Sequence, residues 1–144
     1  MIIGFSGYAQ TGKSTSAQIL VRDFHYVEKS FAGPLKESLL RLDPYIGFNT
    51  RLKYTVDAWG WEFAKKYPEC RELLQRMGTE VGREMFGENF WVDQALRGTG
   101  GEDLVTFSDV RFRSEASAIK DHGGKIIRIE RDGRGPVNEH KSET

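Results

Sequence analysis

The 144-residue sequence has few of the features that mark secreted or membrane proteins. It has one cysteine, Cys70, so an internal disulfide is excluded, and this usage suits a reducing compartment. No stretch is long and apolar enough to span a membrane, and the apolar start at Ile2 does not resemble a signal peptide. We therefore expect a cytoplasmic protein with no membrane partner.

The sequence also has no net charge, because 21 Lys and Arg residues balance 21 Asp and Glu residues. We therefore do not expect a positive electrostatic field over the whole protein that would attract a nucleic acid polymer. Anions should bind only at local sites. The histidines His25, His122 and His140 have no metal-ligand spacing, and we assign them no catalytic role. The length is typical of one domain, expected to span residues 1–144.

The strongest signal is a glycine-bounded loop near the start of the chain. Residues 7–14 match the pattern G-x-x-x-x-G-K-[ST], between an apolar stretch at 2–6 and an amphipathic stretch at 12–23. A strand, a loop and a helix in this order are the context of a phosphate-binding P-loop. Backbone N–H groups and the positive end of the helix then surround an anion. The pattern predicts a site for a nucleoside triphosphate with Mg²⁺, but it does not identify the acceptor.

The fixed positions of this loop have separate chemical roles. Gly7 and Gly12 allow backbone conformations and a close approach that a side chain would prevent. Lys13 can contact the β- and γ-phosphates, and the Ser14 hydroxyl can bind Mg²⁺. The other residues that we assign to the phosphate-binding loop are Gln10, Thr11 and Thr15.

The rest of the chain is expected to alternate between strands and helices. The expected strands are 2–6, 26–31, 104–108 and 125–130. The expected helices are 12–23, 34–42, 68–86, 90–96 and a segment from Ser114 to Gly123. Residues 45–67 should begin irregularly and contain a short helix at 56–66. The alternation predicts an α/β fold with a parallel sheet, whose ligands bind beyond the carboxyl ends of the strands.

Several residues are expected to have packing or capping roles. Leu74, Met77, Val81 and Met85 are at helical spacing and predict one apolar stripe. Ser114 is expected to cap the helix that follows it. The aromatic residues interpreted as packing residues are Trp59, Trp61 and Phe63.

Charged residues gather near the expected strand ends. Asp109 follows a buried strand, where it could hold Mg²⁺ through water, accept a hydrogen bond from a substrate or cap a helix. Arg131 lies beside a strand end in a glycine-containing loop, and a phosphate-contacting lid is favoured for it. For Arg134, a lid and a solvated loop are equally favoured, whereas Arg113 is expected to face solvent. Lys36 could meet an acceptor phosphate.

Arg76 and Arg83 are seven residues apart, which would put them on one face of an α-helix. With Gly82 beside them they could hold a monophosphate, but spacing alone slightly favours a surface paired with nearby glutamates. Trp91 could stack on a base, although a core position is the more common one. These alternatives remain open on spacing alone.

Taken together, several runs resemble the deoxynucleoside monophosphate (dNMP) kinases of bacteriophages. The runs are Gly4 to Gly7 with Lys13 to Thr15, Phe31 to Lys36, Leu73 to Glu80 with Gly82, Arg83 and Trp91, Ser108 to Phe112 with Glu115 and Ala116, and Gly123 to Arg131. Many kinases share the loop, whereas the runs Leu-Gln-Arg-x-Gly-Thr-Glu and Asp-Val-Arg-Phe are far more specific.

The resemblance implies an adenylate-kinase-like three-layer fold that transfers the γ-phosphate of ATP to a dNMP, with Mg²⁺ as cofactor. It implies that Lys13 and Arg131 are catalytic and that Arg128 binds phosphate. It also implies an acceptor site, whose residues would be Lys36, Arg76, Gly82, Arg83, Trp91, Asp109, Arg111 and Glu115. Ser14 and Asp109 would be the metal ligands. The location would be the host cytoplasm for a phage-encoded enzyme, and a homodimer is one possible assembly.

The sequence departs from the family at two places. Arg113 and Ser114 stand where the family usually has Pro-Asn. Family members also continue beyond the position of Thr144, so a C-terminal strand and helix are expected to be missing. Two alternatives remain: a P-loop kinase for an acceptor such as dephospho-coenzyme A or phosphomevalonate, and a nucleotide-binding module without catalysis.

Overall fold

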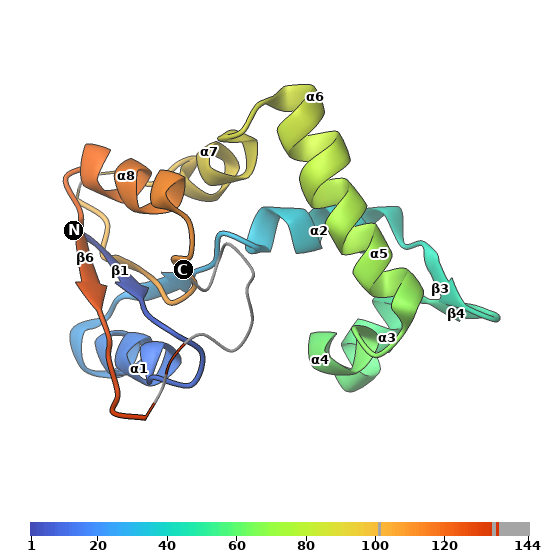
Figure 1. Cartoon of the computed structure of the whole chain (residues 1–144), viewed down its shortest axis with the longest axis horizontal. Helices are drawn as coiled ribbons and strands as arrows, with labels where there is room; N and C mark the ends of the chain where they lie inside the picture. Colours follow the sequence, from blue (N-terminus) through green and yellow to red (C-terminus); the bar gives the residue numbers. More distant parts are fainter. Residues whose placement is uncertain (101, 134, 136–144) are drawn as a thin grey trace. The chain divides into compact units, whose positions relative to one another are not determined.

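The computed structural model describes residues 1–100, 102–133 and 135 (Figure 1). The chain forms two compact units. Unit 1 comprises Met1–Phe31 and Val92–Thr144, and unit 2 comprises Ala32–Trp91. The expectation of one domain over the whole chain stays a prediction.

Unit 1 is built on a four-stranded sheet with the strand order β2-β5-β1-β6. The strands are β1 (Ile2–Ser6), β2 (Val27–Lys29), β5 (Val105–Phe107) and β6 (Lys125–Arg128). All three pairings are parallel, and Gly4 of β1 lies between Phe107 of β5 and Ile126 of β6. The predicted α/β fold with a central parallel sheet is therefore confirmed, and all four strands end at the same edge.

Helices pack on both faces of this sheet. Figure 1 shows α1 (Lys13–Phe24) on one side of β1 and β6, and α8 (Arg113–Asp121) on the other. Inside unit 1, the rings of Phe31 and Phe107 stack with centroids 4.4 Å apart. Buried residues of β1, β5, α8 and α7 (Phe90–Leu96), together with Val110 between β5 and α8, complete this core. Those in the four elements include Ile2, Val92, Ala95, Leu96, Val105 and Ile119. The helices thus fix the sheet whose carboxyl edge carries the site.

Unit 2 is mainly helical and contains one antiparallel hairpin. Its elements are α2 (Gly33–Leu42), β3 (Tyr45–Gly47), β4 (Thr50–Arg51), α3 (Leu52–Trp59), α4 (Trp61–Ala64), α5 (Pro68–Arg76), the π-helix η1 (Met77–Arg83) and α6 (Glu84–Phe86). The buried residues of its core are Leu39, Ile46, Leu52, Ala64 and Cys70.

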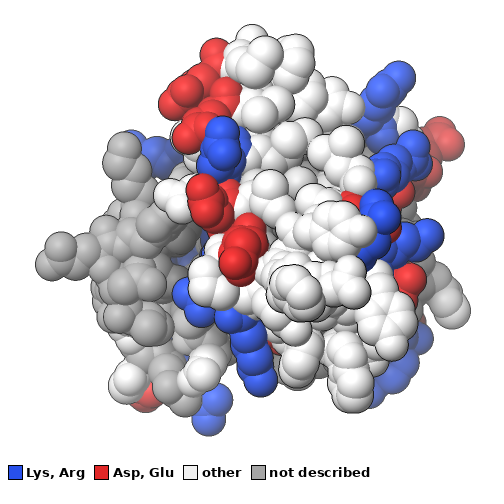
Figure 2. All heavy atoms as spheres, turned by 90° about the vertical axis from the view of Figure 1, so that its right-hand side faces the viewer, with Lys and Arg blue, Asp and Glu red and all other residues white. Residues whose placement is uncertain are grey.

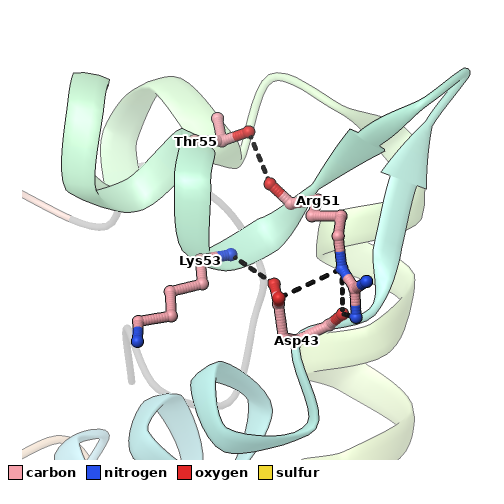
Figure 3. Close-up of polar contacts among 4 residues, drawn as sticks. All are labelled: Asp43, Arg51, Lys53 and Thr55. Carbon is pink, nitrogen blue, oxygen red and sulfur yellow. Dashed lines mark hydrogen bonds and ion pairs between the residues drawn. The ribbon is translucent and has the colours of Figure 1, made fainter.

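The hairpin β3–β4 is held by Asp43, which follows α2 with a φ of 50° (Figure 3). The Asp43 carboxylate pairs with Arg51 at 3.0 Å and accepts a hydrogen bond of 2.9 Å from the backbone N–H of Lys53. The Thr55 hydroxyl donates to the carbonyl oxygen of Arg51 at 2.9 Å. The prediction of an irregular start after residue 44 was therefore wrong, because the chain forms the hairpin β3–β4 there. The Asp43 side chain that holds this hairpin connects residues up to ten positions apart.

The segment 68–86 is helical as predicted, but its central part, Met77–Arg83, is a π-helix. Gly78 and Gly82 lie in this part, and glycine has the weakest preference for the α-helix after proline. The periodicity changes there, so the predicted stripe fails at its end, and Met85 is 69% exposed. A core position for Trp59 was wrong, because its side chain is 67% exposed, but its ring lies 5.6 Å from the ring of Phe63.

The start of α8 also differs from the prediction. The helix begins at Arg113, so Ser114 lies inside it and is not its cap. The N-cap residue is Phe112, and the Glu115 carboxylate accepts its backbone N–H. A glutamate in the first turn thus replaces the hydroxyl cap that the sequence suggested.

Within the described residues, we find no helix with both the length and the apolar character needed to cross a membrane.

Candidate active site

The loop between β1 and α1 has the backbone geometry that its glycines allow. Gly7, Gln10 and Gly12 have φ values of 143°, 60° and 108°. A Cβ atom at Gly7 would overlap the carbonyl oxygen of Ile129, so this position has no room for a side chain. Gly12 precedes the first residue of α1 and has no side chain that could cap the helix. The first backbone N–H groups of α1 can therefore face an anion.

Lys13 is the first residue of α1, and its side chain folds back over the loop. The ammonium donates hydrogen bonds to the carbonyl oxygens of Gly7 at 2.5 Å and Tyr8 at 3.1 Å. The hydroxyl of Thr11 donates to the same Tyr8 oxygen at 2.8 Å. Ser14 follows in the first turn of α1, where it is exposed. A positive charge and a hydroxyl thus lie at the place where the loop could enclose a phosphate.

Arg128, at the end of β6, lies next to this loop. Its guanidinium is 5.4 Å from the ring centre of Tyr8, and it pairs with Glu130 at 2.8 Å. Hydrogen bonds to Glu130 and then to Tyr8 raise the pKa of Arg128 above its ordinary value. Arg131 follows Glu130 and is exposed, whereas Arg134 lies outside the described residues. The structure therefore brings a second cation to the phosphate loop, as the prediction for Arg128 requires.

Asp109 lies just beyond β5, and both of its carboxylate oxygens accept hydrogen bonds. The Ser30 hydroxyl donates to one oxygen at 2.7 Å, and the backbone N–H of Phe31 donates to the other at 3.1 Å. Asp109 thus connects the end of β5 to the segment that follows β2. Sequence reasoning missed Ser30, although its position directly after a strand and before the run Phe31 to Pro34 was a usable signal.

Glu115 is a buried carboxylate, only 7% exposed, that organises the segment after Asp109. One of its oxygens accepts the backbone N–H of Arg111 at 2.7 Å and that of Phe112 at 3.0 Å. The side chain of Arg111 is exposed. Glu115 therefore fixes the backbone from which Arg111 projects.

In unit 2, the predicted acceptor residues lie on α2 and on the helix that contains η1. The Lys36 ammonium is 5.5 Å from the ring centre of Trp61. Arg76 pairs with Glu80 at 3.0 Å, and this hydrogen bond raises the pKa of Arg76. The π-helix separates Arg76 from Arg83, so their spacing no longer places them on one face. That inference from the spacing was wrong, and their binding roles stay predictions.

Trp91 is buried against η1, with 8% of its surface exposed. Its indole N–H donates a hydrogen bond of 3.0 Å to the carbonyl oxygen of Gly78. A Cβ atom at Gly82 would overlap the indole of Trp91. The absence of a side chain at Gly82 therefore leaves room for the indole to pack there. The structure therefore shows a packing role for Gly82 and Trp91, and their contact with a nucleotide stays a prediction.

Unit 1 brings four sets of predicted residues to the carboxyl edge of its sheet. They are the loop of residues 7–15 after β1, Asp109 with Arg111 and Glu115 after β5, Arg128 at the end of β6, and Arg131 beyond it. Within the described ranges, no group of three or more His, Cys, Asp or Glu residues could hold a metal ion.

No family model matches the chain. A protein of Acanthamoeba polyphaga mimivirus, named "Putative deoxynucleotide monophosphate kinase", is 31% identical to it over 164 aligned residues. The alignment covers 99% of this chain and 80% of the mimivirus protein. With the parallel sheet and the loop after β1, this relationship indicates a kinase that acts on nucleotides. The chain belongs to the deoxynucleotide monophosphate kinase family.

Proposed function

We propose that the protein transfers the γ-phosphate of ATP to a deoxynucleoside monophosphate and releases ADP and the deoxynucleoside diphosphate. The observation that carries this proposal is the loop from Gly7 to Ser14. It follows a central strand, has left-handed backbone at Gly7, Gln10 and Gly12, and leads into α1 through Lys13. The family relationship supports a nucleotide as the acceptor.

Lys13 and the loop N–H groups would bind the phosphates of ATP. The Lys13 ammonium contacts the carbonyl oxygens of Gly7 and Tyr8, so it lies within reach of the space that the loop surrounds. Phosphoryl transfer needs positive charge around the moving group more than it needs a covalent intermediate. Arg128 beside Tyr8 and the exposed Arg131 would add positive charge from the end of β6.

Mg²⁺ fits the donors that this chain offers when it binds together with ATP. Mg²⁺ prefers oxygen ligands and usually keeps several waters, with few ligands from the protein. The exposed Ser14 hydroxyl would be one such ligand. Asp109 would act through water, because its carboxylate oxygens already accept hydrogen bonds from Ser30 and Phe31. The bound ion would neutralise negative charge on the phosphates.

The acceptor nucleotide would be held by cations and by a pocket for its base and sugar. Arg76, Arg83 and Lys36 are the candidate cations for its phosphate. Because the π-helix takes Arg76 and Arg83 off one face, a single guanidinium would hold the phosphate oxygens in a bidentate manner. Arg111, whose backbone Glu115 fixes, would contribute to the base and sugar pocket with Asp109. Positioning of both substrates and exclusion of water would then supply catalysis without a strong general base.

The test compares Lys13→Ala with wild type and with Lys120→Ala, which removes an exposed lysine of α8 far along the chain. We expect Lys13→Ala to lose at least ~100-fold in acceptor-dependent ADP release, as for other groups that stabilise developing charge. Its thermal unfolding should remain cooperative, and Lys120→Ala should match wild type. Normal turnover by Lys13→Ala would refute this mechanism.

A further inference from the structure

Two serine hydroxyls of unit 1 donate hydrogen bonds to carboxylates at the ends of β2 and β5. The pairing of these strands ends one residue before each serine. The Ser30 hydroxyl donates to Asp109 at 2.7 Å, and the Ser108 hydroxyl donates to Glu28 at 2.8 Å. The hairpin side of unit 2, in contrast, presents a broad uncharged area to solvent (Figure 2), so a site for a charged ligand is better sought at these strand ends.

The Asp109 carboxylate is held at both of its oxygens. The Ser30 hydroxyl contacts Oδ2, and the backbone N–H of Phe31 contacts Oδ1 at 3.1 Å. Phe31 is itself fixed, because it is buried and its ring stacks on that of Phe107. The terminal torsion of an aspartate has broad minima, so a single donor would leave the carboxylate able to rotate. The Ser30 hydroxyl therefore contributes the second point that fixes its plane.

The orientation of this carboxylate matters for a contact that runs through water. Mg²⁺ demands nearly ideal octahedral geometry, so the waters that it keeps have fixed positions relative to the bound phosphates. A carboxylate accepts hydrogen bonds from such waters only if its oxygens point toward them. Groups that orient a ligand in this way typically change metal affinity or activity by about tenfold to a hundredfold.

We propose that Ser30 is a positioning residue for Asp109. Its hydroxyl holds the carboxylate in the orientation in which Asp109 accepts hydrogen bonds from the waters of Mg²⁺ bound with ATP. This inference rests on one part of the proposed function, the binding of ATP together with Mg²⁺ at the carboxyl edge of the sheet. It adds a residue that acts on the metal only through Asp109.

Ser108 provides a matched control for Ser30. Both hydroxyls are half-buried or at the surface, both donate to a carboxylate, and both bonds join the ends of β2 and β5. The acceptor of the Ser108 bond is Glu28, to which we assign no role in the site. If the two hydroxyls served only to hold the strands together, Ser30→Ala and Ser108→Ala would have the same effects.

The first test measures the binding of a non-hydrolysable ATP analogue by calorimetric titration, with Mg²⁺ and with a chelator. In chelator, Ser30→Ala should bind the analogue as wild type does. With Mg²⁺, its affinity should fall by about tenfold. Ser108→Ala should match wild type, and so should Ser30→Thr, which keeps a hydroxyl. An unchanged affinity of Ser30→Ala with Mg²⁺ would overturn the proposal, as would an equal loss in Ser108→Ala.

The second test combines Ser30→Ala with Asp109→Ala in a double-mutant cycle. Because Ser30 acts only through Asp109, the double variant should bind the analogue with Mg²⁺ as Asp109→Ala alone does. Losses that add up in the double variant would show that Ser30 acts independently of Asp109, contrary to the proposal.

Turnover separates a failure of this inference from a failure of the proposed function. With an active wild type, Ser30→Ala should lower kcat and raise the Mg²⁺ concentration needed for the half-maximal rate, at an unchanged KM for the deoxynucleoside monophosphate. A rise in that KM alone would overturn the inference. If wild type transfers phosphate to no deoxynucleoside monophosphate but Ser30→Ala still weakens binding only with Mg²⁺, the proposed function fails and the role of Ser30 stands. Wild-type ATP binding that does not respond to Mg²⁺ would overturn both.

Discussion

The indole N–H of Trp91 donates a hydrogen bond of 3.0 Å to the carbonyl oxygen of Gly78, on the π-helix that precedes it. Gly82, on the same π-helix, makes room for the indole ring. π-helical turns occur frequently at functional sites. The π-helix ends at Arg83, a predicted acceptor contact. The Trp91 contact with the π-helix therefore helps to fix the position of the Arg83 backbone.

Replacement of Gly82 by alanine tests this contact. We expect Gly82→Ala to lower the free energy of unfolding by about 1–3 kcal/mol, because the new Cβ would displace the indole from a packed position. Gly78→Ala is the matched control, since its Cβ would meet only the flexible end of Leu35 at 3.3 Å. The better helix propensity of alanine should make that change neutral or stabilising. Equal unfolding midpoints in urea for both variants would contradict the proposed packing role.

Asp109 should contribute to stability before any metal or nucleotide is bound. We expect Asp109→Ala to lower the free energy of unfolding by about 2 kcal/mol, because it removes hydrogen bonds from Ser30 and Phe31 to a charged group. Ser30→Ala should cost less, since the Phe31 N–H keeps its acceptor. The free energy of unfolding is measured by chemical denaturation with a metal chelator present and no nucleotide. If Asp109→Ala is then as stable as wild type, the predicted contribution to stability is contradicted, and Asp109 acts only when a ligand is bound.

Cys70 should be inert in the folded protein. Its side chain is fully buried, and burial raises the pKa of the thiol. The thiolate is the nucleophile, so we expect a thiol reagent to modify Cys70 only at the rate of unfolding. Rapid modification of the native protein at neutral pH would contradict this account.

The same raised pKa predicts how Cys70 affects stability at alkaline pH. The unfolded thiol ionises at about pH 8.5, before the folded thiol does. The contribution of the protonated Cys70 thiol to the stability of the folded protein is therefore complete below that pH. It is lost as the pH rises through the pKa of the folded thiol. We expect wild type to lose stability more steeply than Cys70→Ala over this range. Parallel curves of unfolding free energy against pH would show that the shift is absent.

The features that the sequence predicted best are those with local causes. The strand at Ile2–Ser6 and the loop at 7–14 follow from a short apolar run and from glycine positions, and the structure shows the expected strand and left-handed backbone. The helix at Phe90–Leu96 was also predicted with its bounds. The order of strands and helices was enough to predict the parallel sheet and the edge that carries the site.

The features that the sequence did not predict depend on contacts between distant residues. Asp43 holds a hairpin through Arg51 and Lys53, and no periodicity signals such a contact. The π-helix at Met77–Arg83 contacts Trp91, which lies beyond the end of that helical segment and donates a hydrogen bond to Gly78. The roles of individual site residues need a bound nucleotide to be tested, so they stay predictions.

The most direct test of the account is a coupled assay of ADP release with ATP and Mg²⁺ against a panel of acceptors. The panel contains deoxynucleoside and ribonucleoside monophosphates, dephospho-coenzyme A and phosphomevalonate, and ATP binding is measured in parallel. The account predicts ADP release that depends on a deoxynucleoside monophosphate, with the deoxynucleoside diphosphate as the second product. ATP binding without ADP release for any deoxynucleoside monophosphate would contradict it.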